Sequence, residues 1–289
     1  MTERVTESVT ERTAERTAER TAERTAERVT DTVLSTDKIS LVYNDGAEGA
    51  DTLRDFTNRL LGRPPTPHTA RQTYALREVS IEIPNKRFVG IMGPSGSGKS
   101  SLLYILSGLK RPTGGDVQIG DYRYGKHSDL DLIDLRRQRF GFVFQQPYLL
   151  VWQTAMENVL MGAPTLDATA RKKAVGYFEQ LGIGDMADKL PSQLSGGEKQ
   201  RVCVARAMMN DPEVIFADEP TASLDHANGH LVVDLLSAYR ERGTVVVVTH
   251  DPEMLQGADA VLMMRDGQSM GWRDPAEVLG AGPSKTVAL

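Results

Sequence analysis

The chain has 289 residues, 40% of them hydrophobic and 25% charged, which is the composition of a globular protein with an ample core. A formal net charge of -5 gives no basic balance for holding nucleic-acid phosphates, so we expect no nucleic-acid partner. The single cysteine, Cys203, excludes an intrachain disulfide, and its apolar neighbours at helical spacing predict a buried thiol in a reducing compartment.

The first part of the sequence is of low complexity. Residues 1–36 contain the tandem repeat TAER, from Thr13 to Arg28, whose period of four places like charges one helical turn apart. No apolar stripe, signal-peptide core or run of about 18 apolar residues is present, so we expect a solvated tail and no membrane span.

Alternating apolar residues predict two strands in the stretch from Lys38 to Pro84. KISLVYNDG, from Lys38, is typical of a strand followed by a turn, and YALREVSIEIP, ending at Pro84, resumes the alternation. Between them the apolar residues of ADTLRDFTNRLLG share one helical face, which predicts a helical insertion over residues 47–73.

Three short apolar runs, FVGIM, VIFA and TVVVVT, are typical of buried parallel strands. Helical patterns separate them, and this alternation predicts an α/β fold with right-handed crossovers. Residues 147–205 have helical periodicity without a strong strand, which predicts an inserted helical subdomain. We expect the main domain over residues 37–270 and a C-terminal tail over residues 271–289.

A glycine-rich stretch, GPSGSGKSS, fits the phosphate-loop pattern between a buried strand and an apolar helix. Glycines let the backbone approach closely, so that successive N–H groups surround the phosphates. We expect Lys99 to contact the β- and γ-phosphates and Ser100 to hold Mg²⁺ through its hydroxyl. The residues expected to bind the nucleotide here are Gly93, Pro94, Ser95, Gly96, Ser97, Gly98, Lys99, Ser100 and Ser101.

Acidic and polar residues follow the other buried strands. Asp218 fits the metal-side aspartate of a phosphate-loop ATPase, and Glu219 beside it is placed to polarise the attacking water. Because the carboxyl ends of parallel strands share one edge, His250 is expected to reach the γ-phosphate and Gln145 to reach Mg²⁺ or its water. Taken alone, the acidic pair would suit a helix cap and His250 a structural role.

The stretch LSGGEKQRV begins a helix in which Ser195 and Glu198 can form a capping box. Gly196 and Gly197 follow in its first turn, where each glycine costs about 1 kcal/mol of helix stability relative to alanine. They leave the first N–H groups bare, which is how a helix end holds a phosphate. The sequence therefore predicts a second phosphate site, far along the chain from the first.

In chain order, GPSGSGKS, FQQ, LSGGEKQ, VIFADEPTASLD and VVVVTHD resemble the motifs of ABC transporter ATP-binding subunits, over about Lys38 to Gly267. GFVFQQPYLLVWQTAMENVLMG and ADEPTASLD are most similar to the lipoprotein-release and macrolide-export type. The chain departs from the family at Ser101, where threonine is usual, and at PNKRF, which replaces the usual Gly-Glu. The resemblance implies a P-loop NTPase fold with a mainly parallel core sheet, an antiparallel β edge and a helical subdomain, and ATP hydrolysis with Mg²⁺.

The resemblance also implies residue roles. Glu219 would be the general base, His250 the switch histidine, and Gln145 a catalytic residue near the metal that Ser100 and Asp218 hold. In this family two subunits pack head to tail around two ATP molecules. The residues that would complete the partner's nucleotide site are Ser195, Gly196, Gly197, Glu198 and Asp225.

An aromatic ring that stacks on adenine is implied as well. Tyr43 is the candidate, and Tyr74, beyond the insertion, is the alternative. The apolar side chains after Gln145 are expected either to receive a permease or to pack in the core. They are Tyr148, Leu149, Leu150 and Trp152.

Together these observations predict an ATPase subunit, a homodimer or a heterodimer with a related subunit, that drives an integral-membrane permease from the cytoplasmic face of the cell membrane. The alternative is the same dimeric ATPase regulating a membrane complex, as in the cell-division branch, without a transported substrate. A P-loop kinase is disfavoured, because it would use neither the helix start at Ser195 nor the carboxylate of Glu219.

Overall fold

The structure, a computed structural model, describes residues 32–45, 71–120, 122–124 and 128–280. The TAER repeats and most of the insertion expected over residues 47–73 lie outside these ranges. The end of that insertion, residues 71–73, already belongs to strand β2, Arg71–Pro84.

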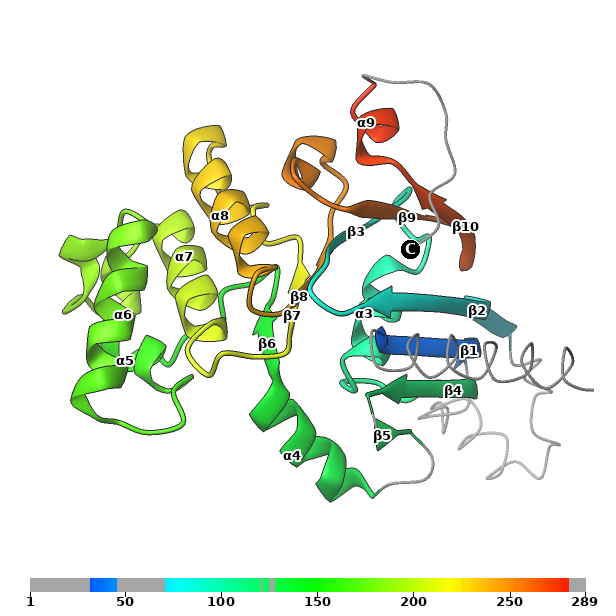
Figure 1. Cartoon of the computed structure of the whole chain (residues 1–289), viewed down its shortest axis with the longest axis horizontal. Coiled ribbons are helices and arrows are strands. Elements are labelled where there is room, and N and C mark those ends of the chain that lie inside the picture. The colour runs from blue at the N-terminus through cyan, green and yellow to red at the C-terminus, as the bar shows by residue number, and fades with distance from the viewer. Residues whose placement is uncertain (1–31, 46–70, 121, 125–127, 281–289) are drawn as a thin grey trace, which may run out of the picture.

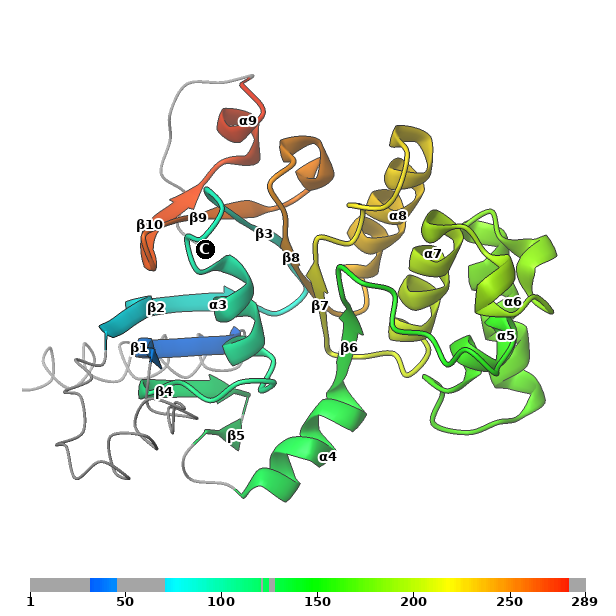
Figure 2. The ribbon, with the colours of Figure 1, turned by 180° about the vertical axis from the view of Figure 1, so that it is seen from behind.

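A six-stranded sheet with the order β10-β9-β3-β8-β7-β6 forms the centre of the fold (Figures 1 and 2). Its neighbouring strands are parallel except that β10 is antiparallel to β9. Every residue of β3, β7 and β8 is buried, which explains their continuous apolar runs and confirms the three predicted parallel strands. The strands are β3 (Phe88–Met92), β6 (Phe140–Val143), β7 (Val214–Asp218), β8 (Thr244–Val248), β9 (Ala260–Arg265) and β10 (Gln268–Arg273).

A smaller antiparallel sheet, in the order β2-β1-β4-β5, forms the predicted β edge. Its other strands are β1 (Thr32–Asp45), β4 (Gly114–Ile119) and β5 (Tyr122–Arg123). β1 begins before Lys38, where we expected the folded part to start, because Leu34 is fully buried between Ile83 and Ile119 of its two neighbouring strands. Helix α3 (Lys99–Leu106) packs between the two sheets and joins them into one hydrophobic cluster.

Helices α5 (Ala155–Leu160), α6 (Ala168–Gln180) and α7 (Gly196–Ala207) gather beside β6, at the left of Figure 1. No strand lies in the described stretch from residue 144 to residue 213, as expected for the helical subdomain. Cys203 is buried in α7, and burial raises the pKa of its thiol to about 11, as expected for an inert core cysteine. Within the described ranges, no helix has both the length and the hydropathy to cross a bilayer.

The remaining helices connect or cover the sheets. They are α4 (Asp129–Arg139), α8 (His226–Tyr239) and α9 (Pro275–Val278), with the 3-10 helices η1 (Gly184–Met186), η2 (Pro191–Gln193) and η3 (Pro252–Leu255). β10 and α9 extend past residue 270, where we expected the domain to end. The reason is apolar contact, because Trp272 and Val278 pack against the two hydrophobic clusters.

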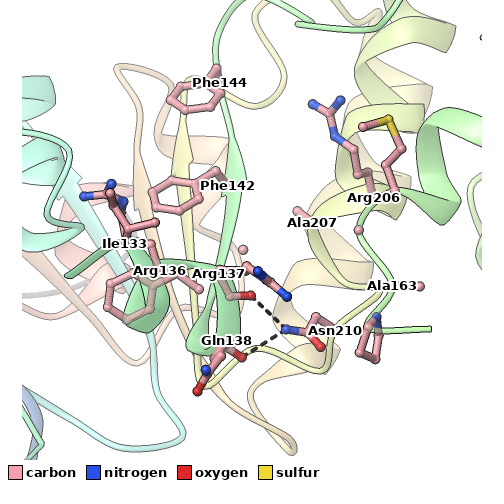
Figure 3. A pocket seen from close by; sticks show the side chains of 15 residues that line it. Ile133, Arg136, Arg137, Gln138, Phe142, Phe144, Ala163, Arg206, Ala207 and Asn210 are labelled. Atoms are coloured by element: carbon pink, nitrogen blue, oxygen red, sulfur yellow. Dashed lines mark hydrogen bonds between the residues drawn. The ribbon is translucent and has the colours of Figure 1, made fainter. Parts of the chain in front are cut away.

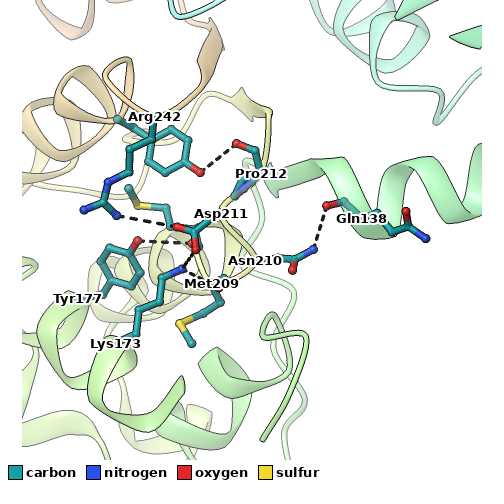
Figure 4. Close-up of polar contacts among 10 residues, drawn as sticks. Gln138, Lys173, Tyr177, Met209, Asn210, Asp211, Pro212 and Arg242 are labelled. Carbon is teal, nitrogen blue, oxygen red and sulfur yellow. Dashed lines mark hydrogen bonds and ion pairs between the residues drawn. The ribbon is translucent and has the colours of Figure 1, made fainter. Parts of the chain in front are cut away.

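The loop between α7 and β7 fastens the helical subdomain to the sheet (Figure 4). Asp211, in a left-handed conformation with φ 46°, accepts a 2.6 Å hydrogen bond from Lys173 Nζ of α6. Asn210 Nδ2 donates to two carbonyl oxygens at the end of α4, each at 3.0 Å. The Tyr239 hydroxyl of α8 donates to the Pro212 carbonyl at 2.9 Å. One short loop therefore fixes the C-terminal end of α7 relative to α4, α6, α8 and β7.

Candidate active site

The glycine-rich loop lies between β3 and α3, at the carboxyl edge of the central sheet. Gly93 has φ 155° and Gly98 has φ 95°. A Cβ would lie 2.1 Å from the Met264 carbonyl oxygen at Gly93 and 2.4 Å from the Ala75 carbonyl oxygen at Gly98. Neither position accepts a side chain, so neighbouring strands fix both glycines and the path of the loop with them.

A cavity of about 440 Å³ opens over this loop. Its lining residues come from the loop, from the first turn of α3, from β2 and from the positions just after β6, β7 and β8. They are Ala75, Ser95, Gly96, Gly98, Lys99, Ser100, Ser101, Gln145, Glu219 and His250. The carboxyl edge of the sheet thus brings Gln145, Glu219 and His250 to the phosphate loop, as the strand ends predicted.

Lys99 places the positive charge of this site. Its ammonium group donates hydrogen bonds to the carbonyl oxygens of Gly93, at 2.8 Å, and Pro94, at 3.0 Å. The side chain is held within the curve of the loop, and the residue is only 9% exposed. A buried ammonium with two neutral partners favours an anionic ligand, which is what a nucleotide phosphate supplies.

Asp218, at the end of β7, is 4% exposed and meets α3 through both carboxylate oxygens. Oδ1 accepts a 3.0 Å hydrogen bond from Ser100 Oγ, and Oδ2 accepts a 2.9 Å hydrogen bond from the Tyr104 hydroxyl. Hydroxyl and carboxylate oxygens are the ligands that Mg²⁺ prefers, so Ser100 and Asp218 fit that ion.

Tyr104 is a site residue that the sequence motifs do not reveal. Burial, followed by its hydrogen bond to Asp218, raises the Tyr104 pKa to about 12, so the hydroxyl remains a donor at neutral pH. The sequence feature that could have indicated Tyr104 is its spacing: it follows Ser100 by four positions and therefore lies on the same face of α3, one turn later. Its hydrogen bond orients the carboxylate that faces Ser100.

Glu219 is held at the wall of the cavity by two residues that follow β8. Its Oε1 lies 2.8 Å from Nδ1 of His250, and its Oε2 accepts a 3.3 Å hydrogen bond from Thr249 Oγ1. The Glu219 backbone has φ 47°, a conformation that costs a non-glycine residue about 1–3 kcal/mol. Its backbone N–H donates to the Val248 carbonyl at 2.8 Å, so the neighbouring strand β8 holds the turn that places the Glu219 carboxylate in the cavity lining.

Comparison with known proteins decides the family. Residues 76–222 match the family model described as ABC transporter, and this range contains the phosphate loop, Gln145, Ser195, Asp218 and Glu219. The chain belongs to the ABC transporter family. It is an ATP-binding subunit of that family, and its resemblance to the lipoprotein-release and macrolide-export type is confirmed by its relatives.

Two of these relatives show how far the similarity extends. The lipoprotein-releasing system ATP-binding protein LolD of Aquifex aeolicus is 42% identical over 202 residues, 68% of this chain and 89% of LolD. The macrolide export ATP-binding/permease protein MacB of Rhodospirillum rubrum is 45% identical over 200 residues, 67% of this chain but only 30% of MacB.

The fold agrees with solved ABC cassettes. The dimeric structure of the ABC transporter cassette MJ0796 has a TM-score of 0.70 and 33% identity, covering 83% of this chain and 97% of that one. A second dimeric structure of MJ0796, in a post-hydrolysis state with ADP and Pi, matches equally well. The protein is therefore an ABC ATPase that uses ATP and Mg²⁺, and the ion, when bound, neutralises charge on the phosphates.

The residues that we expect to form the ABC signature, Ser195, Gly196 and Gly197, lie outside the lining of the cavity over the phosphate loop. Ser195 caps α7 in the predicted capping box, where its Oγ accepts from the Glu198 N–H at 3.2 Å and its own N–H donates to Glu198 Oε2 at 2.7 Å. A Cβ at Gly197 would lie 3.0 Å from Leu224, whereas one at Gly196 would meet nothing closer than 3.9 Å. Gly197 therefore lets Leu224 pack closely against α7, and Gly196 leaves the start of the helix uncovered.

Other predicted residues also lie outside the cavity lining: Gly93, Pro94 and Ser97 of the loop, Asp218 beside it, and, elsewhere in the chain, Asp225, Tyr43 and Tyr74. Asp225 caps α8, and the backbone N–H of Asn228 that it accepts lowers its pKa. Tyr43 and Tyr74 are exposed on paired strands, and each ring lies beneath a basic side chain. Lys110 Nζ lies 3.9 Å from the centroid of the Tyr43 ring, and the guanidinium carbon of Arg77 lies 4.9 Å from the centroid of the Tyr74 ring. Adenine stacking on either ring stays a prediction.

Proposed function

We propose that this ATPase closes head to tail with a second subunit, the same chain or a related one, around two ATP molecules, and so drives a membrane permease. The observation that carries the proposal is the incomplete cavity. It holds Lys99, Gln145, Glu219 and His250 but none of the signature residues. Ser195 and Gly196 are exposed at the open end of α7 and free to face a partner's nucleotide.

In this proposal each side chain has one task. Lys99 and the loop N–H groups bind the phosphates, while Ser100, Asp218 and Gln145 hold the Mg²⁺ side. Glu219 accepts a proton from water as the water oxygen attacks the γ-phosphorus and ADP leaves. The contacts of Glu219 with His250 and Thr249 support this role, because they fix the carboxylate before the reaction begins.

Replacing Ser195 with arginine tests the head-to-tail arrangement. We expect the isolated monomer to keep its ATP affinity, because Ser195 does not line the cavity, and steady-state hydrolysis to fall at least about 100-fold, because the side chain blocks the partner's γ-phosphate. Equilibrium binding and phosphate release measure the two effects. Gln180→Arg adds the same charge to an exposed position on α6 and should leave both unchanged. Loss of monomer binding in Ser195→Arg would place the signature in its own chain's site.

A groove of about 680 Å³ between β6 and the helical subdomain is the surface that we assign to the permease. In Figure 3, Phe142 of β6 and Phe144, which directly follows that strand, line one side of it, and Arg206 and Ala207 of α7 line the other. Gln200 Nε2 of α7 donates a 2.9 Å hydrogen bond to the carbonyl oxygen of Phe144, the residue immediately before Gln145. A segment seated in this groove would therefore press on the residue that leads into the nucleotide cavity.

The aromatic residues after Gln145 extend this surface. Tyr148 and Trp152 are 62% and 72% exposed, and the Tyr148 ring packs edge-on against Phe144 with centroids 5.6 Å apart. Leu149, by contrast, packs against the core, so we assign only Tyr148 and Trp152 to the permease contact. Exposed aromatic side chains are typical anchors of protein interfaces.

The double variant Tyr148→Ala/Trp152→Ala tests this surface. We expect recovery of co-expressed permease on affinity purification of the subunit to fall about tenfold or more, because two interface anchors are lost. ATP affinity of the isolated subunit should not change, since neither residue lines the cavity. Met270→Ala, a 51% exposed apolar residue on β10, is the control and should keep full recovery. Full recovery by the double variant would remove the assignment.

Transport and regulation differ in one measurement. We place the subunit at the cytoplasmic face of the cell membrane, where it is peripheral and held by the permease. The test is to reconstitute the subunit and the permease in lipid vesicles, with a labelled macrolide and a lipid-modified peptide as probes. ATP-dependent movement or release of either probe supports transport. ATP hydrolysis by the membrane-bound complex without movement of either supports the regulatory alternative.

A further inference from the structure

We propose that His226, His230 and Glu253 form a surface site for a divalent transition-metal ion such as Zn²⁺, separate from the nucleotide cavity. His226 begins α8 and His230 follows it by four positions, so both imidazoles lie on one face of the helix. Two histidines at this helical spacing are a recognised zinc-binding arrangement. Glu253, from η3, supplies a carboxylate to the same face.

The distances suit one shared ion. Nε2 of His226 lies 3.1 Å from Nε2 of His230, close to the separation of two ligand atoms that are each about 2.0–2.1 Å from a tetrahedral metal. Oε2 of Glu253 lies 3.5 Å from the other ring nitrogen of His226, Nδ1, and one ligand atom from each of the three residues falls within 4.8 Å of the others. The Glu253 side chain is 53% exposed, so its carboxylate can turn toward the two imidazoles without disturbing the core.

The donor set selects the class of ion. Two imidazole nitrogens and one carboxylate suit Zn²⁺, Ni²⁺ or Cu²⁺, whereas Mg²⁺ and Ca²⁺ prefer sites made of oxygen atoms. The His226 side chain is 70% exposed, so water can fill the remaining coordination positions. The chain therefore carries two chemically different cation sites: the Ser100 and Asp218 oxygens for Mg²⁺, and this nitrogen-rich one.

An ion at this site would join two segments that leave the nucleotide cavity. Glu219 and His250 line that cavity; α8 begins seven residues after Glu219, and η3 begins two residues after His250. The two elements are already packed together, since Met254 is buried and its Cε would lie 3.5 Å from a Cβ at Gly229, between the two histidines. Coordination would tie Glu253 to α8 and so restrain the segment that carries His250.

Titration of the untagged, chelator-treated full chain with Zn²⁺ in excess Mg²⁺ tests the site. We expect one calorimetric binding event, a higher melting temperature in saturating Zn²⁺, and visible absorption bands of nitrogen-ligated Co²⁺ when Co²⁺ replaces it. His230→Gln and Glu253→Gln should each weaken Zn²⁺ binding about tenfold or more, and the double variant His226→Gln/His230→Gln should abolish the Co²⁺ bands.

Two control variants separate this site from others. His250→Gln removes the remaining histidine of the described residues and should leave Zn²⁺ affinity unchanged, because His250 pairs with Glu219 instead. Asp234→Asn, an exposed carboxylate one turn beyond His230, should also bind normally. The proposal is overturned if the double histidine variant binds Zn²⁺ as tightly as the native chain, or if binding is lost in His250→Gln alone. An unaltered native melting temperature and spectrum in Zn²⁺ and Co²⁺ would show instead that the imidazole pair is only hydrogen-bonded.

Discussion

Glu219→Gln is expected to slow ATP hydrolysis about 10²–10⁴-fold while ATP binding persists. The amide keeps the shape of the carboxylate but cannot take a proton from water. The contacts that position it, His250 Nδ1 at 2.8 Å and Thr249 Oγ1 at 3.3 Å, can both be made to an amide. Since ATP then persists between the two subunits, the variant should accumulate as a dimer on size-exclusion chromatography with ATP and Mg²⁺.

The matched control for this experiment is Glu213→Gln. Glu213 immediately precedes β7, at the opposite end of the strand from Glu219; its side chain is 51% exposed and pairs with Arg139, and neither residue lines the cavity. We expect hydrolysis within twofold of the native rate, because exposed ion pairs contribute about 0–1 kcal/mol. Single-turnover phosphate release compares the two variants. A native rate in Glu219→Gln would assign the proton acceptor to another group.

Lys99→Ala should weaken ATP binding at least about 100-fold. Its ammonium lies against the carbonyl oxygens of Gly93 and Pro94, where the phosphate loop curves round the ligand. Each lost hydrogen bond to a charged group costs about 1.5–3 kcal/mol, and each 1.4 kcal/mol is a factor of ten in affinity. Two such bonds to phosphate oxygens account for the expected loss.

Equilibrium binding of a fluorescent ATP analogue measures this change. Lys172→Ala removes an equal charge from an exposed position in the middle of α6, where alanine is also a good helix former. It should bind ATP as the native chain does. The melting temperature of Lys99→Ala without nucleotide serves as a folding check. Native affinity in a folded Lys99→Ala protein would contradict the assignment of the loop.

Binding energy and hydrolysis have separate roles in the proposed cycle. A ligand shifts a conformational equilibrium only by the difference between its affinities for the two states. Here the open end of α7 would add its N–H groups to the partner's nucleotide only in the closed dimer, so ATP would favour closure and its hydrolysis would remove that preference. The capping box of Ser195 and Glu198 leaves the first N–H groups of α7 available for this role.

Much of the fold and the site could be predicted because their signals are local in the sequence. A buried parallel strand needs a short apolar run, as in β3, β7 and β8, and a phosphate loop needs glycines at fixed spacing before Lys99. The capping box of α7 depends on residues three positions apart. Such features follow from backbone geometry over a few residues, so they predicted the phosphate loop and its metal ligand, and the resemblance carried by the ordered motifs added ATP hydrolysis.

Only the tertiary structure decided how distant residues meet. The meeting of Ser100 with Asp218 was expected from the resemblance, but the third member, Tyr104, was not: it joins them because two carboxylate oxygens of one buried residue require two donors. The early start of β1, the exposure of Tyr148 beside a packed Leu149, and the meeting of His226 with Glu253 likewise depend on which elements pack together. No local pattern encodes those contacts, because burial is a property of neighbours that are remote in the chain.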